Sequence, residues 1–488
     1  MFLKGLMGYL PANLLQGVIG FLTLTIFTRI LSPEDYGRYA LALGVTSLAY
    51  TACFCWIEAA MARFYPVEKN DDVDAPELYG TLYRLFAAVA LLLIGISALG
   101  LYLWPTPTPG GQALKIAIGA GLISIVSRSL LRMAQEQRRS EGRVSASAGI
   151  DMLQTGGGFL LGVLFAYLGL KGGAPLLGAG VMALILLPFF VREDWGRARR
   201  GVWSAPKAVS YARYGFPITL SLILSLGLYT LDRFLIAHFM SEADVGAYQA
   251  GFSLASRVID VLFIWFGAAG VPSMINALET GGDKALKDEA RQQILLIALL
   301  AFPAVAGLIS LASPLTELLI GENLRGNALA ITPLVTLGAL LAGLNNGYFL
   351  LPFSLTKKTH LLILAMSAPA LANIALNLFL IPRMGLQGAA LAYALSFAIG
   401  IASSWLLGLR ATALPVPIFD LAKIAASAAL MGFILSKVPP LGMMAELVIK
   451  PPLGILIYGA LIFGLDICGA RSHARRLLAK FLPSTTTA

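Results

Sequence analysis

Residues 32–39 read Ser-Pro-Glu-Asp-Tyr-Gly-Arg-Tyr, and residues 241–248 read Ser-Glu-Ala-Asp-Val-Gly-Ala-Tyr. Both stretches follow the pattern S-x-x-D-x-G-x-Y, and each comes directly after a long apolar segment. In each copy we expect the serine and the aspartate to cap a helical turn. We expect the glycine to break that turn and the tyrosine to lie at a membrane interface. A pattern that recurs at equivalent places indicates a chain built from two similar halves.

The composition indicates that lipid surrounds most of this chain. Hydrophobic residues make up 58% of the 488 residues and charged residues only 13%, whereas a soluble protein carries about a quarter of charged residues. This argues against a cytosolic enzyme, a nucleic-acid binder and a secreted domain. The sequence has three cysteines, too few for a disulfide framework. Its three histidines are far apart in sequence and do not indicate a metal cluster. The pattern G-x-x-x-x-G-K-[ST] is absent from the sequence, and we expect no cofactor and no metal.

Fourteen segments are long and apolar enough to cross a membrane, which takes about 20 residues. The sequence therefore predicts an all-α integral membrane protein with about 14 transmembrane helices. Lysine and arginine gather in alternate loops, which predicts that both termini lie in the cytoplasm. The predicted spans are 6–28, 39–61, 82–103, 113–131, 144–170, 174–191, 216–239, 245–275, 294–311, 328–351, 361–381, 386–407, 418–435 and 447–467.

The two copies of the repeat lie six spans apart, so the two halves have parallel topology. We expect two parallel six-helix lobes around a central cavity, related by a pseudo-two-fold axis along the membrane normal, which is typical of a transporter. The predicted domains are an N-lobe (1–191, spans 1–6), a cytoplasmic basic linker (192–211), a C-lobe (212–410, spans 7–12), the appended spans 13 and 14 (411–468) and a cytoplasmic basic tail (469–488).

Several stretches are similar to a known family. Residues 27–40 read Phe-Thr-Arg-Ile-Leu-Ser-Pro-Glu-Asp-Tyr-Gly-Arg-Tyr-Ala, and Tyr-Gly-Phe-Pro at 214–217, Leu-Asp-Arg-Phe-Leu-Ile at 231–236 and the hairpin sequence at 377–390 come later. Together they resemble the bacterial polysaccharide-biosynthesis (Wzx-like) membrane proteins. These are lipid-linked oligosaccharide flippases of the multidrug/oligosaccharidyl-lipid/polysaccharide (MOP) exporter superfamily.

This resemblance implies a transporter of the bacterial cytoplasmic (inner) membrane, not an enzyme. Such a protein moves undecaprenyl-pyrophosphate-linked oligosaccharide to the periplasmic leaflet by alternating access, for cell-surface polysaccharide synthesis. The implied partners are the polyprenyl-pyrophosphate-linked glycan, membrane lipids and, as candidates, polysaccharide polymerase or assembly proteins; no nucleic acid is expected.

Three other functions are compatible with parts of the sequence. A lipid II flippase of the same superfamily also has fourteen spans. A cation-coupled multidrug exporter would carry several embedded acids and few embedded cations, whereas this chain has about as many embedded arginines as acids. A membrane glycan polymerase or ligase needs acid–base groups near a roomy extramembrane site, and the outer loops here are short.

Ionisable residues inside predicted spans are candidate site residues, because a charge in the hydrocarbon costs at least a few kcal/mol. Arg257 lies near the middle of span 8, and Asp260 lies one turn further on the same face. Arg257 is a candidate for binding the pyrophosphate, since guanidinium holds phosphate through paired donors. The alternative is an Arg257–Asp260 pair that satisfies only itself.

Two candidates lie at the outer ends of spans. Asp232, in span 7, and Arg29, at the end of span 1, are candidates for binding a sugar phosphate or for gating; interfacial ion pairs are the alternative. Gln16 in span 1 is a candidate for lining the cavity.

Other candidates lie toward the cytoplasmic ends of spans 2 to 5. Arg84, Arg128 and Glu58 are expected at a basic inner mouth that attracts an anionic head group. Snorkelling side chains and a Glu–Arg pair are the alternative. Asp151 and Glu58 are candidate ion-coupling residues, because a buried carboxylate can couple its protonation to transport. Asp151 paired with Arg128 or with Arg143 is the alternative.

Overall fold

The computed structural model describes residues 2–71, 75–106, 108–356, 358–467 and 471. In this described part of the chain all regular structure is helical, as the sequence predicts. The helices are α1 (Phe2–Ile30), α2 (Pro33–Asp71), α3 (Pro76–Leu103), α4 (Pro109–Ser140), α5 (Val144–Tyr167), η1 (Lys171–Gly173), α6 (Ala174–Phe190), α7 (Arg192–Arg200), α8 (Ala205–Phe239), α9 (Glu242–Ser310), α10 (Ala312–Leu319), α11 (Glu322–Leu344), the π-helical turn η2 (Asn345–Phe349), α12 (Leu351–Leu355), α13 (Thr359–Gly408), α14 (Ile418–Ser436) and α15 (Met443–Gly464).

Every predicted span falls on helical structure, although some run up to three residues past a helix end and 328–351 covers parts of α11, η2 and α12. Eleven helices of the described chain are long and apolar enough to cross a membrane, and Leu14–Ile30 is a shorter apolar helix. Two of the eleven, α9 and α13, each contain two predicted spans joined at a single glycine. Gly282 (φ 66°) and Gly385 (φ 57°) have positive φ, which reverses the chain between the two arms. The fourteen-span prediction is therefore compatible with the helices observed.

The chain divides into two compact units. The first holds residues 1–250 and 320–324, and the second holds residues 251–319 and 325–488. This grouping puts α8 in the first unit, whereas the sequence repeat makes the same helix the start of the second lobe. The predicted lobes and their boundaries stay a prediction. Of the predicted tail 469–488, all but Arg471 lies outside the described residues.

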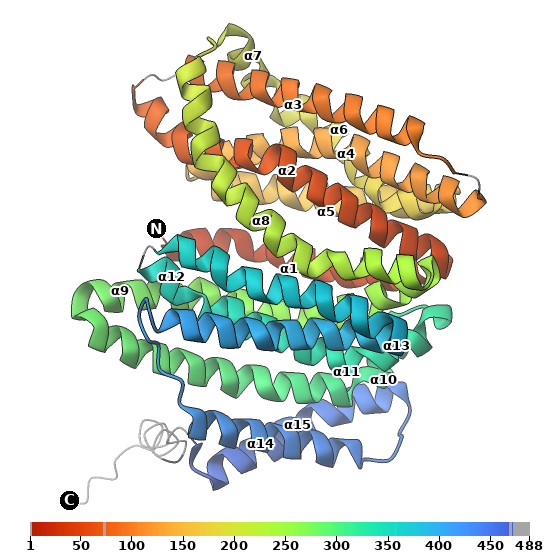
Figure 1. Cartoon of the computed structure of the whole chain (residues 1–488), viewed down its shortest axis with the longest axis vertical. Helices are drawn as coiled ribbons and strands as arrows, with labels where there is room; N and C mark the ends of the chain where they lie inside the picture. Colours follow the sequence, from red (N-terminus) through yellow and green to blue (C-terminus); the bar gives the residue numbers. More distant parts are fainter. Residues whose placement is uncertain (1, 72–74, 107, 357, 468–470, 472–488) are drawn as a thin grey trace, which may run out of the picture. The chain divides into compact units, whose positions relative to one another are not determined.

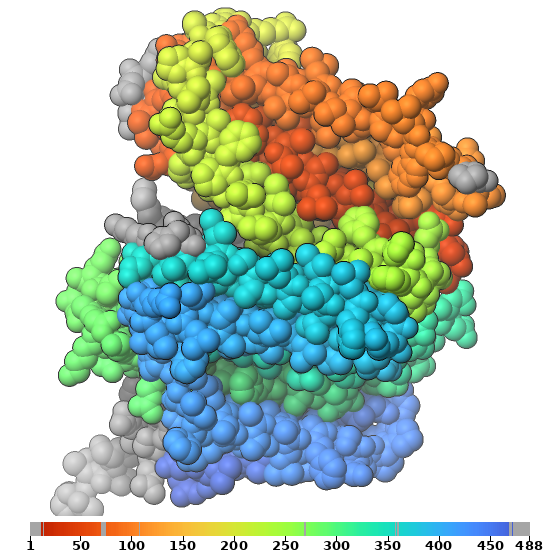
Figure 2. Space-filling model, viewed as in Figure 1, coloured from red at the N-terminus to blue at the C-terminus, as the bar shows by residue number. Residues whose placement is uncertain are grey.

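In the first unit, α2 is the central helix and packs against α4 and α8 (Figure 1). The helix α5 packs against α1 and α6. Phe54, Tyr83 and Phe86 are buried in the core that these helices share. Trp56 of α2 stacks on Phe216 of α8 with 5.3 Å between the ring centroids, and the outer side of α8 (yellow-green) forms part of the surface in Figure 2.

In the second unit, the two arms of α9 pack with α11 and η2 around Ile259, Ile297 and Tyr348. The helices α14 and α15 lie side by side (Figure 1). The turn in α13 is tight, since a Cβ on Gly388 would lie 2.4 Å from the carbonyl oxygen of Leu380. The predicted hairpin at 377–390 is therefore confirmed.

The two copies of the repeat begin helices in the same way. The backbone N–H of Asp35 donates to Ser32 Oγ at 3.2 Å at the start of α2. The N–H of Asp244 donates to Ser241 Oγ at 3.1 Å at the start of α9. Both serines therefore cap a helix with an aspartate at the third position, and the predicted capping is confirmed.

The two glycines of the repeat have a different role from the one predicted. Gly37 and Gly246 do not break a turn; both lie inside helices, α2 and α9. A Cβ on Gly37 would lie 1.7 Å from the carbonyl oxygen of Glu242, and a Cβ on Gly246 would lie 2.4 Å from that of Pro33. The glycines are needed because the two copies of the repeat touch each other backbone to backbone.

Charged and aromatic side chains surround this glycine contact. Arg38 pairs with Asp35 of its own helix and with Glu242 of the other copy, at 2.7 Å each. Tyr248 is fully buried inside the protein, so its ring does not face lipid, and its place at the level of the membrane interface stays a prediction. The tyrosine turns inward because its hydroxyl donates to Asp232 Oδ2 at 2.5 Å.

Candidate functional site

A cavity of about 190 Å³ lies inside the first unit, between α1, α2, α4, α5 and α6. The space suits a charged head group or another small polar group. Its lining combines aromatic rings with polar groups. The lining residues include Thr23, Phe27, Tyr39, Arg128, Gln154 and Phe159.

Arg128 is the charged residue of this cavity. It forms neither a hydrogen bond nor an ion pair with any residue that the structure describes, and its side chain is largely buried. Arg132, one turn further along α4, also carries positive charge close by. A guanidinium in apolar surroundings is costly unless an anion compensates it. Glu58 lies within electrostatic reach of Arg128 without forming an ion pair with it, so the guanidinium can bind a negatively charged group that enters the cavity.

Gln154 adds a second unsatisfied polar group to the lining. Its Nε2 donates to the carbonyl oxygen of Ala179 at 2.8 Å, which fixes the orientation of the amide. Its Oε1 is buried without a hydrogen-bond partner in the described chain. An unsatisfied buried acceptor costs about 1–3 kcal/mol. A ligand that carries a hydroxyl beside its negative charge would satisfy both Gln154 and Arg128.

Glu58, a predicted ion-coupling residue, is buried at the centre of a polar network. It accepts hydrogen bonds from Tyr50 and from Ser129 Oγ, the latter at 2.8 Å. The guanidinium of Arg132 donates to the Tyr50 hydroxyl at 3.3 Å and lies over the Tyr50 ring. The alternative of a Glu–Arg pair is not seen as a direct contact of Glu58 in the described chain, where Tyr50 and Ser129 are its hydrogen-bond partners and Arg132 acts on it electrostatically.

Arg132 is a residue that sequence reasoning missed. The predicted span 4 ended at residue 131, so Arg132 was assigned to a loop, whereas α4 continues to Ser140. The spacing of Arg128 and Arg132 is the signal that would have found it, because residues four apart share a helix face.

Asp151, the other predicted ion-coupling residue, accepts a hydrogen bond from Gln16 Nε2. This bond joins α5 to α1 and brings together two residues that the sequence predicted separately. Arg132 lies within electrostatic reach of the same carboxylate. The alternative, a pair of Asp151 with Arg128 or Arg143, is not seen in the described chain. Asp151 and Arg128 form no ion pair there, and Arg143 pairs with Glu141 at 3.6 Å.

Arg84 and Arg29 lie away from the cavity. Arg84 Nη2 donates to the carbonyl oxygen of Gly201 at 3.1 Å and so holds the linker that precedes α8. Arg29 is exposed near the end of α1. The residue before it, Thr28, accepts a hydrogen bond from the N–H of Gly321 at 2.9 Å through its hydroxyl. Arg84 and Arg29 therefore stay predicted binding residues. Arg84 itself makes a structural contact, and the residue next to Arg29 makes one.

Asp232 is fully buried and both of its oxygens are occupied. Arg233 Nη1 lies 2.9 Å from Oδ1, and the Tyr248 hydroxyl donates to Oδ2. Arg233 Nε in turn donates to Gln249 at 2.6 Å. This network matches the alternative that the sequence left open, an ion pair that joins α8 to the start of α9.

The second unit contains Arg257 and Asp260. Arg257 Nε is buried without a hydrogen-bond partner in the described chain. No ion pair joins Arg257 to Asp260 within the part of the chain that the structure describes, and Asp260 is exposed. The direct ion pair that the sequence left open as the alternative is therefore not observed, although Arg257 acts electrostatically on the Asp260 carboxylate.

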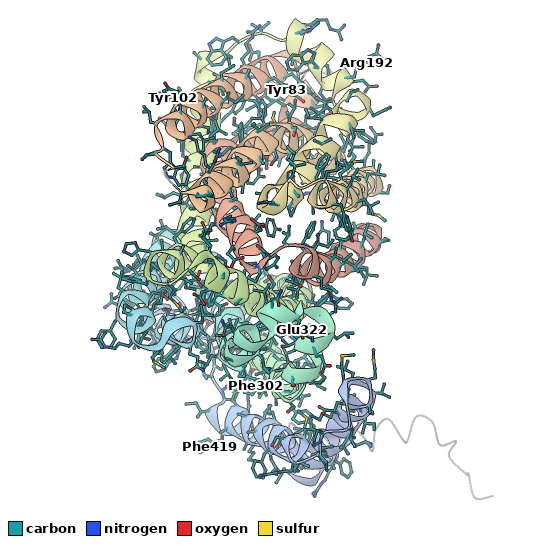
Figure 3. The ribbon with its side chains drawn as sticks, turned by 90° about the vertical axis from the view of Figure 1, so that its right-hand side faces the viewer. Tyr83, Tyr102, Arg192, Phe302, Glu322 and Phe419 are labelled. Carbon is teal, nitrogen blue, oxygen red and sulfur yellow. The ribbon has the colours of Figure 1, made fainter. Side chains whose placement is uncertain are left out.

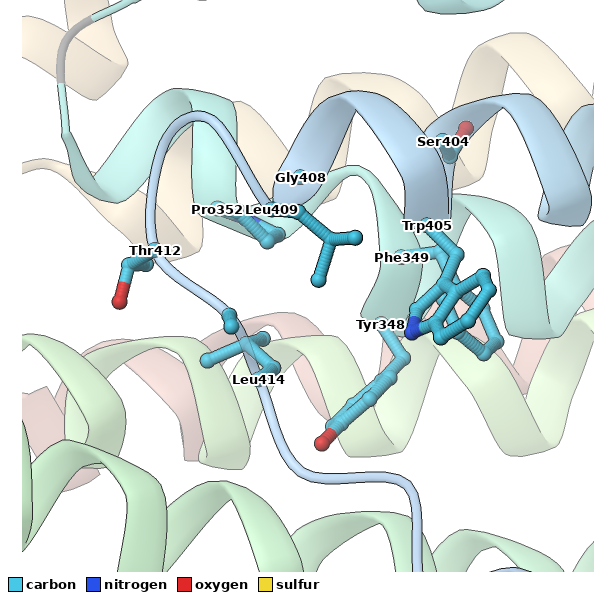
Figure 4. A pocket seen from close by; sticks show the side chains of 10 residues that line it. Tyr348, Phe349, Pro352, Ser404, Trp405, Gly408, Leu409, Thr412 and Leu414 are labelled. Carbon is cyan, nitrogen blue, oxygen red and sulfur yellow. The ribbon is translucent and has the colours of Figure 1, made fainter.

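Two further features of the second unit are less relevant to substrate binding. A small hollow of about 10 Å³ lies beside Tyr348, Trp405 and Leu414 (Figure 4), and it has no room for a ligand. Glu446 and Lys450 form an ion pair at 2.5 Å that the sequence prediction missed. Among the described residues, no three His, Cys, Asp or Glu side chains lie close enough together to hold a metal ion.

Comparison with known proteins identifies the family. The family model for polysaccharide biosynthesis proteins matches residues 26–326, more than half of the chain. The chain belongs to the polysaccharide biosynthesis protein family. This confirms the resemblance to the polysaccharide-biosynthesis proteins that the repeat and its flanking residues indicated.

Curated relatives of this family member are known from bacteria and an archaeon. It is 22% identical to a putative O-antigen transporter of Shigella flexneri, over 80% of this chain and 92% of the relative. It is 23% identical to a probable flippase, AglR, of Haloferax volcanii, over 96% and 97%. It is 26% identical to the succinoglycan biosynthesis transport protein ExoT of Rhizobium meliloti, over 62% of this chain and only 59% of that relative.

Solved structures show which fold the polysaccharide biosynthesis protein has. It is similar to the lipid II flippase MurJ in an inward closed conformation, with a TM-score of 0.74, 16% identity and coverage of 96% of this chain and 99% of the other. It is also similar to an inward-facing multidrug MATE transporter of the MOP superfamily, with a TM-score of 0.66, 14% identity and coverage of 84% and 96%. The chain is therefore a multi-pass membrane protein with the MurJ/MATE fold.

Proposed function

We propose that this protein translocates an undecaprenyl-pyrophosphate-linked oligosaccharide across the bacterial cytoplasmic membrane for cell-surface polysaccharide synthesis. The observation that carries the proposal is Arg128, an unpaired guanidinium that lines a cavity inside a member of the polysaccharide biosynthesis family. A cargo with a phosphate or carboxylate would supply the missing anion. Relatives named as an O-antigen transporter and a flippase support a glycan cargo.

The proposed mechanism is alternating access, with Lys- and Arg-rich loops and both termini in the cytoplasm. The anionic head of the substrate enters from the cytoplasmic leaflet, and the polyprenyl tail stays in the lipid. Arg128 and Arg257 bind the charged head through paired N–H donors. Gln16, Arg29, Arg84, Asp232 and Asp260 are secondary binding candidates that rest on the sequence argument alone.

Energy coupling is assigned to two carboxylates of the first unit, Asp151 and Glu58. Each is held by hydrogen bonds, Asp151 by Gln16 and Glu58 by Tyr50 and Ser129. Both lie within electrostatic reach of Arg132 on the same helix as Arg128. Protonation or cation binding at either carboxylate would change the charge balance around Arg128, which links ion movement to substrate binding.

The test measures which leaflet holds the lipid-linked sugar. The gene is deleted and restored, at matched expression, as wild type, Arg128→Ala, Arg257→Ala or Arg139→Ala. Arg139 lies on the same helix as Arg128 but is exposed, with 57% of its side chain accessible, so Arg139→Ala is the matched control.

We expect the deletion to trap the sugar in the cytoplasmic leaflet. Wild type and Arg139→Ala should release it, and Arg128→Ala should lower the rate of release by at least tenfold. If the deletion does not change which leaflet holds the lipid-linked sugar but raises the sensitivity of the cells to drugs, the protein is instead a drug exporter. Trapping of the peptidoglycan precursor alone would identify a lipid II flippase.

A further inference from the structure

The segment between α6 and α8 presents an unusual surface. It consists of α7 and residues 201–204, and its exposed residues combine arginine with tryptophan. Trp195 and Trp203 are each 44% exposed and Val202 is 56% exposed. Figure 3 shows Arg192 at the edge of the first unit, with its side chain pointing away from the helices. We call Arg192, Trp195, Arg199, Arg200, Val202 and Trp203 the linker surface.

The backbone under the linker surface is held in place. The N–H of Val202 donates to the carbonyl oxygen of Pro76 at 3.0 Å, and that of Ser204 donates to Thr81 Oγ1 at 3.0 Å. A Cβ on Gly201 would lie 2.5 Å from the backbone N of Gly80, so the linker lies directly on α3. The exposure of Trp203 is therefore built into the fold, because a slack loop would not make these contacts.

The helix α7 has two chemically different faces. Asp194 and Ala198 are buried beneath it, and Arg197 donates to the Tyr79 hydroxyl of α3 at 3.1 Å. The Trp195 ring meets the edge of Tyr83, and the Arg199 guanidinium lies over the Trp195 ring at 5.7 Å. The buried face anchors α7 to α3, and the other face presents charge and aromatic surface outward.

The charge of the outward face is positive. Arg192, Arg199 and Arg200 are exposed, and Glu193 is the only exposed acid of residues 191–204, all of which the structure describes. Ion pairs with neighbouring acids do not cancel this charge, since none of the three arginines has an ion pair in the described chain. An anionic partner would therefore gain from all three.

The position of the linker surface identifies that partner. The apolar helix α6 ends at Phe190, and the next candidate span begins at Ala205. The linker surface therefore begins directly where a candidate span ends, which brings α7 close to the membrane surface. Tryptophan favours the head-group level of a bilayer, and arginine near the surface is attracted to anionic lipids.

We propose that the linker surface binds the head groups of anionic phospholipids in the leaflet that it faces. Trp195, Val202 and Trp203 enter the head-group layer, while Arg192, Arg199 and Arg200 contact lipid phosphates and glycerol or serine head groups. The contact fixes α7, and through Gly201 and Arg84 it fixes α3 against the membrane. This inference does not depend on the transported cargo.

The test titrates phosphatidylglycerol or phosphatidylcholine into the purified full-length protein in neutral detergent and measures binding by tryptophan fluorescence. Each arginine is expected to contribute about a fivefold factor in affinity. Arg199→Gln/Arg200→Gln should therefore weaken phosphatidylglycerol binding by at least tenfold and leave phosphatidylcholine binding unchanged. Arg139→Gln/Arg143→Gln removes the same charge from another exposed turn and should keep the preference of the wild type.

A second readout separates lipid binding from misfolding. Trp203→Phe retains an aromatic ring, and it should lower quenching by brominated phosphatidylglycerol while the melting temperature in neutral detergent stays unchanged. The proposal is overturned if the wild type binds both lipids equally. It is also overturned if the control pair loses the preference as strongly as Arg199→Gln/Arg200→Gln.

Discussion

Gly37 and Gly246 occupy the same position in the two copies of the repeat, and a Cβ on either one would lie 3.1 Å from the backbone N of the other. A repeat detected by sequence is thus also a point of contact in space. The Arg38–Glu242 ion pair at 2.7 Å joins the same two helices.

Gly37→Ala is expected to destabilise the protein by about 1–3 kcal/mol, because overpacking against a rigid backbone forces the helices apart. The added methyl group would lie 1.7 Å from the carbonyl oxygen of Glu242. The melting temperature in detergent measures the effect. Gly95→Ala is the control, since no atom lies within 4 Å of a Cβ there, and alanine favours a helix. Equal melting temperatures for the two variants would show that the glycine contact carries no stability.

Arg128→Met is expected to raise stability and abolish transport. The unpaired guanidinium destabilises the folded protein in the absence of substrate, so its removal should gain about 2 kcal/mol. The same removal leaves the cavity without its positive charge, and the sidedness assay should then show trapped substrate. A stability loss on Arg128→Met would instead assign the residue a structural role.

The pKa of Asp194 predicts how stability changes with pH. Burial beneath α7 raises the pKa of this carboxyl from 3.8 to about 6, against the opposing effect of Arg138 and Arg197. The native state therefore binds the proton more tightly than the unfolded chain does. This stabilisation is present below about pH 4 and is lost as the pH rises through about 6, for a total of roughly 3 kcal/mol.

Asp194→Asn removes this titration and should flatten the pH dependence of the melting temperature. Relative to the wild type, the variant should gain about 2–3 kcal/mol between about pH 4 and about pH 7. Glu193→Gln changes the exposed neighbour and should leave the wild-type curve intact. A curve for Asp194→Asn that runs parallel to that of the wild type would rule out Asp194 as the titrating group.

Removing one partner of the buried ion pair in α15 should lower the free energy of unfolding more than removing both partners. Lys450 is 7% exposed and its Nζ lies 2.5 Å from Glu446 Oε2 and 3.5 Å from the carbonyl oxygen of Ser310. Lys450→Met alone leaves a buried carboxylate, and we expect a loss of about 3–5 kcal/mol. Glu446→Leu/Lys450→Met should lie within about 1 kcal/mol of the wild type. Melting temperatures of the single and the double variant measure this difference. Equal losses of stability in the two variants would contradict a tight ion pair.

Local signals in the sequence predicted the helices and their caps well. Hydropathy located the spans, and the S-x-x-D pattern predicted the caps at Ser32 and Ser241 because capping depends only on neighbouring residues. Hydropathy does not tell where a helix continues beyond the membrane, and for this reason Arg132 was assigned to a loop. The role of Gly37 was missed because its partner lies in the other copy of the repeat, and no local pattern encodes that contact.

The candidate site was predicted in part. Arg128, Gln16 and Asp151 were selected as charged or polar residues inside spans, and the structure places Arg128 on a cavity and joins Gln16 to Asp151. The sequence did not reveal which ionisable residues already have partners. Asp232 has two, through Arg233 and Tyr248, and Arg128 has none among the described residues. This distinction depends on contacts between helices that only the folded chain shows.

The turns at Gly282 and Gly385 determine which parts of the chain move as one piece. Each reverses a long helix within a single residue of positive φ, so there is no spare chain between the two arms. The arms of each hairpin are tied at a fixed distance at that end, and neither arm can slide past the other. Residues 411–417, by contrast, connect α13 to α14 without regular helix and have the length to absorb displacement. We therefore expect both arms of each hairpin to stay together if the chain changes shape, and the connection at 411–417 to take up displacement between α13 and α14.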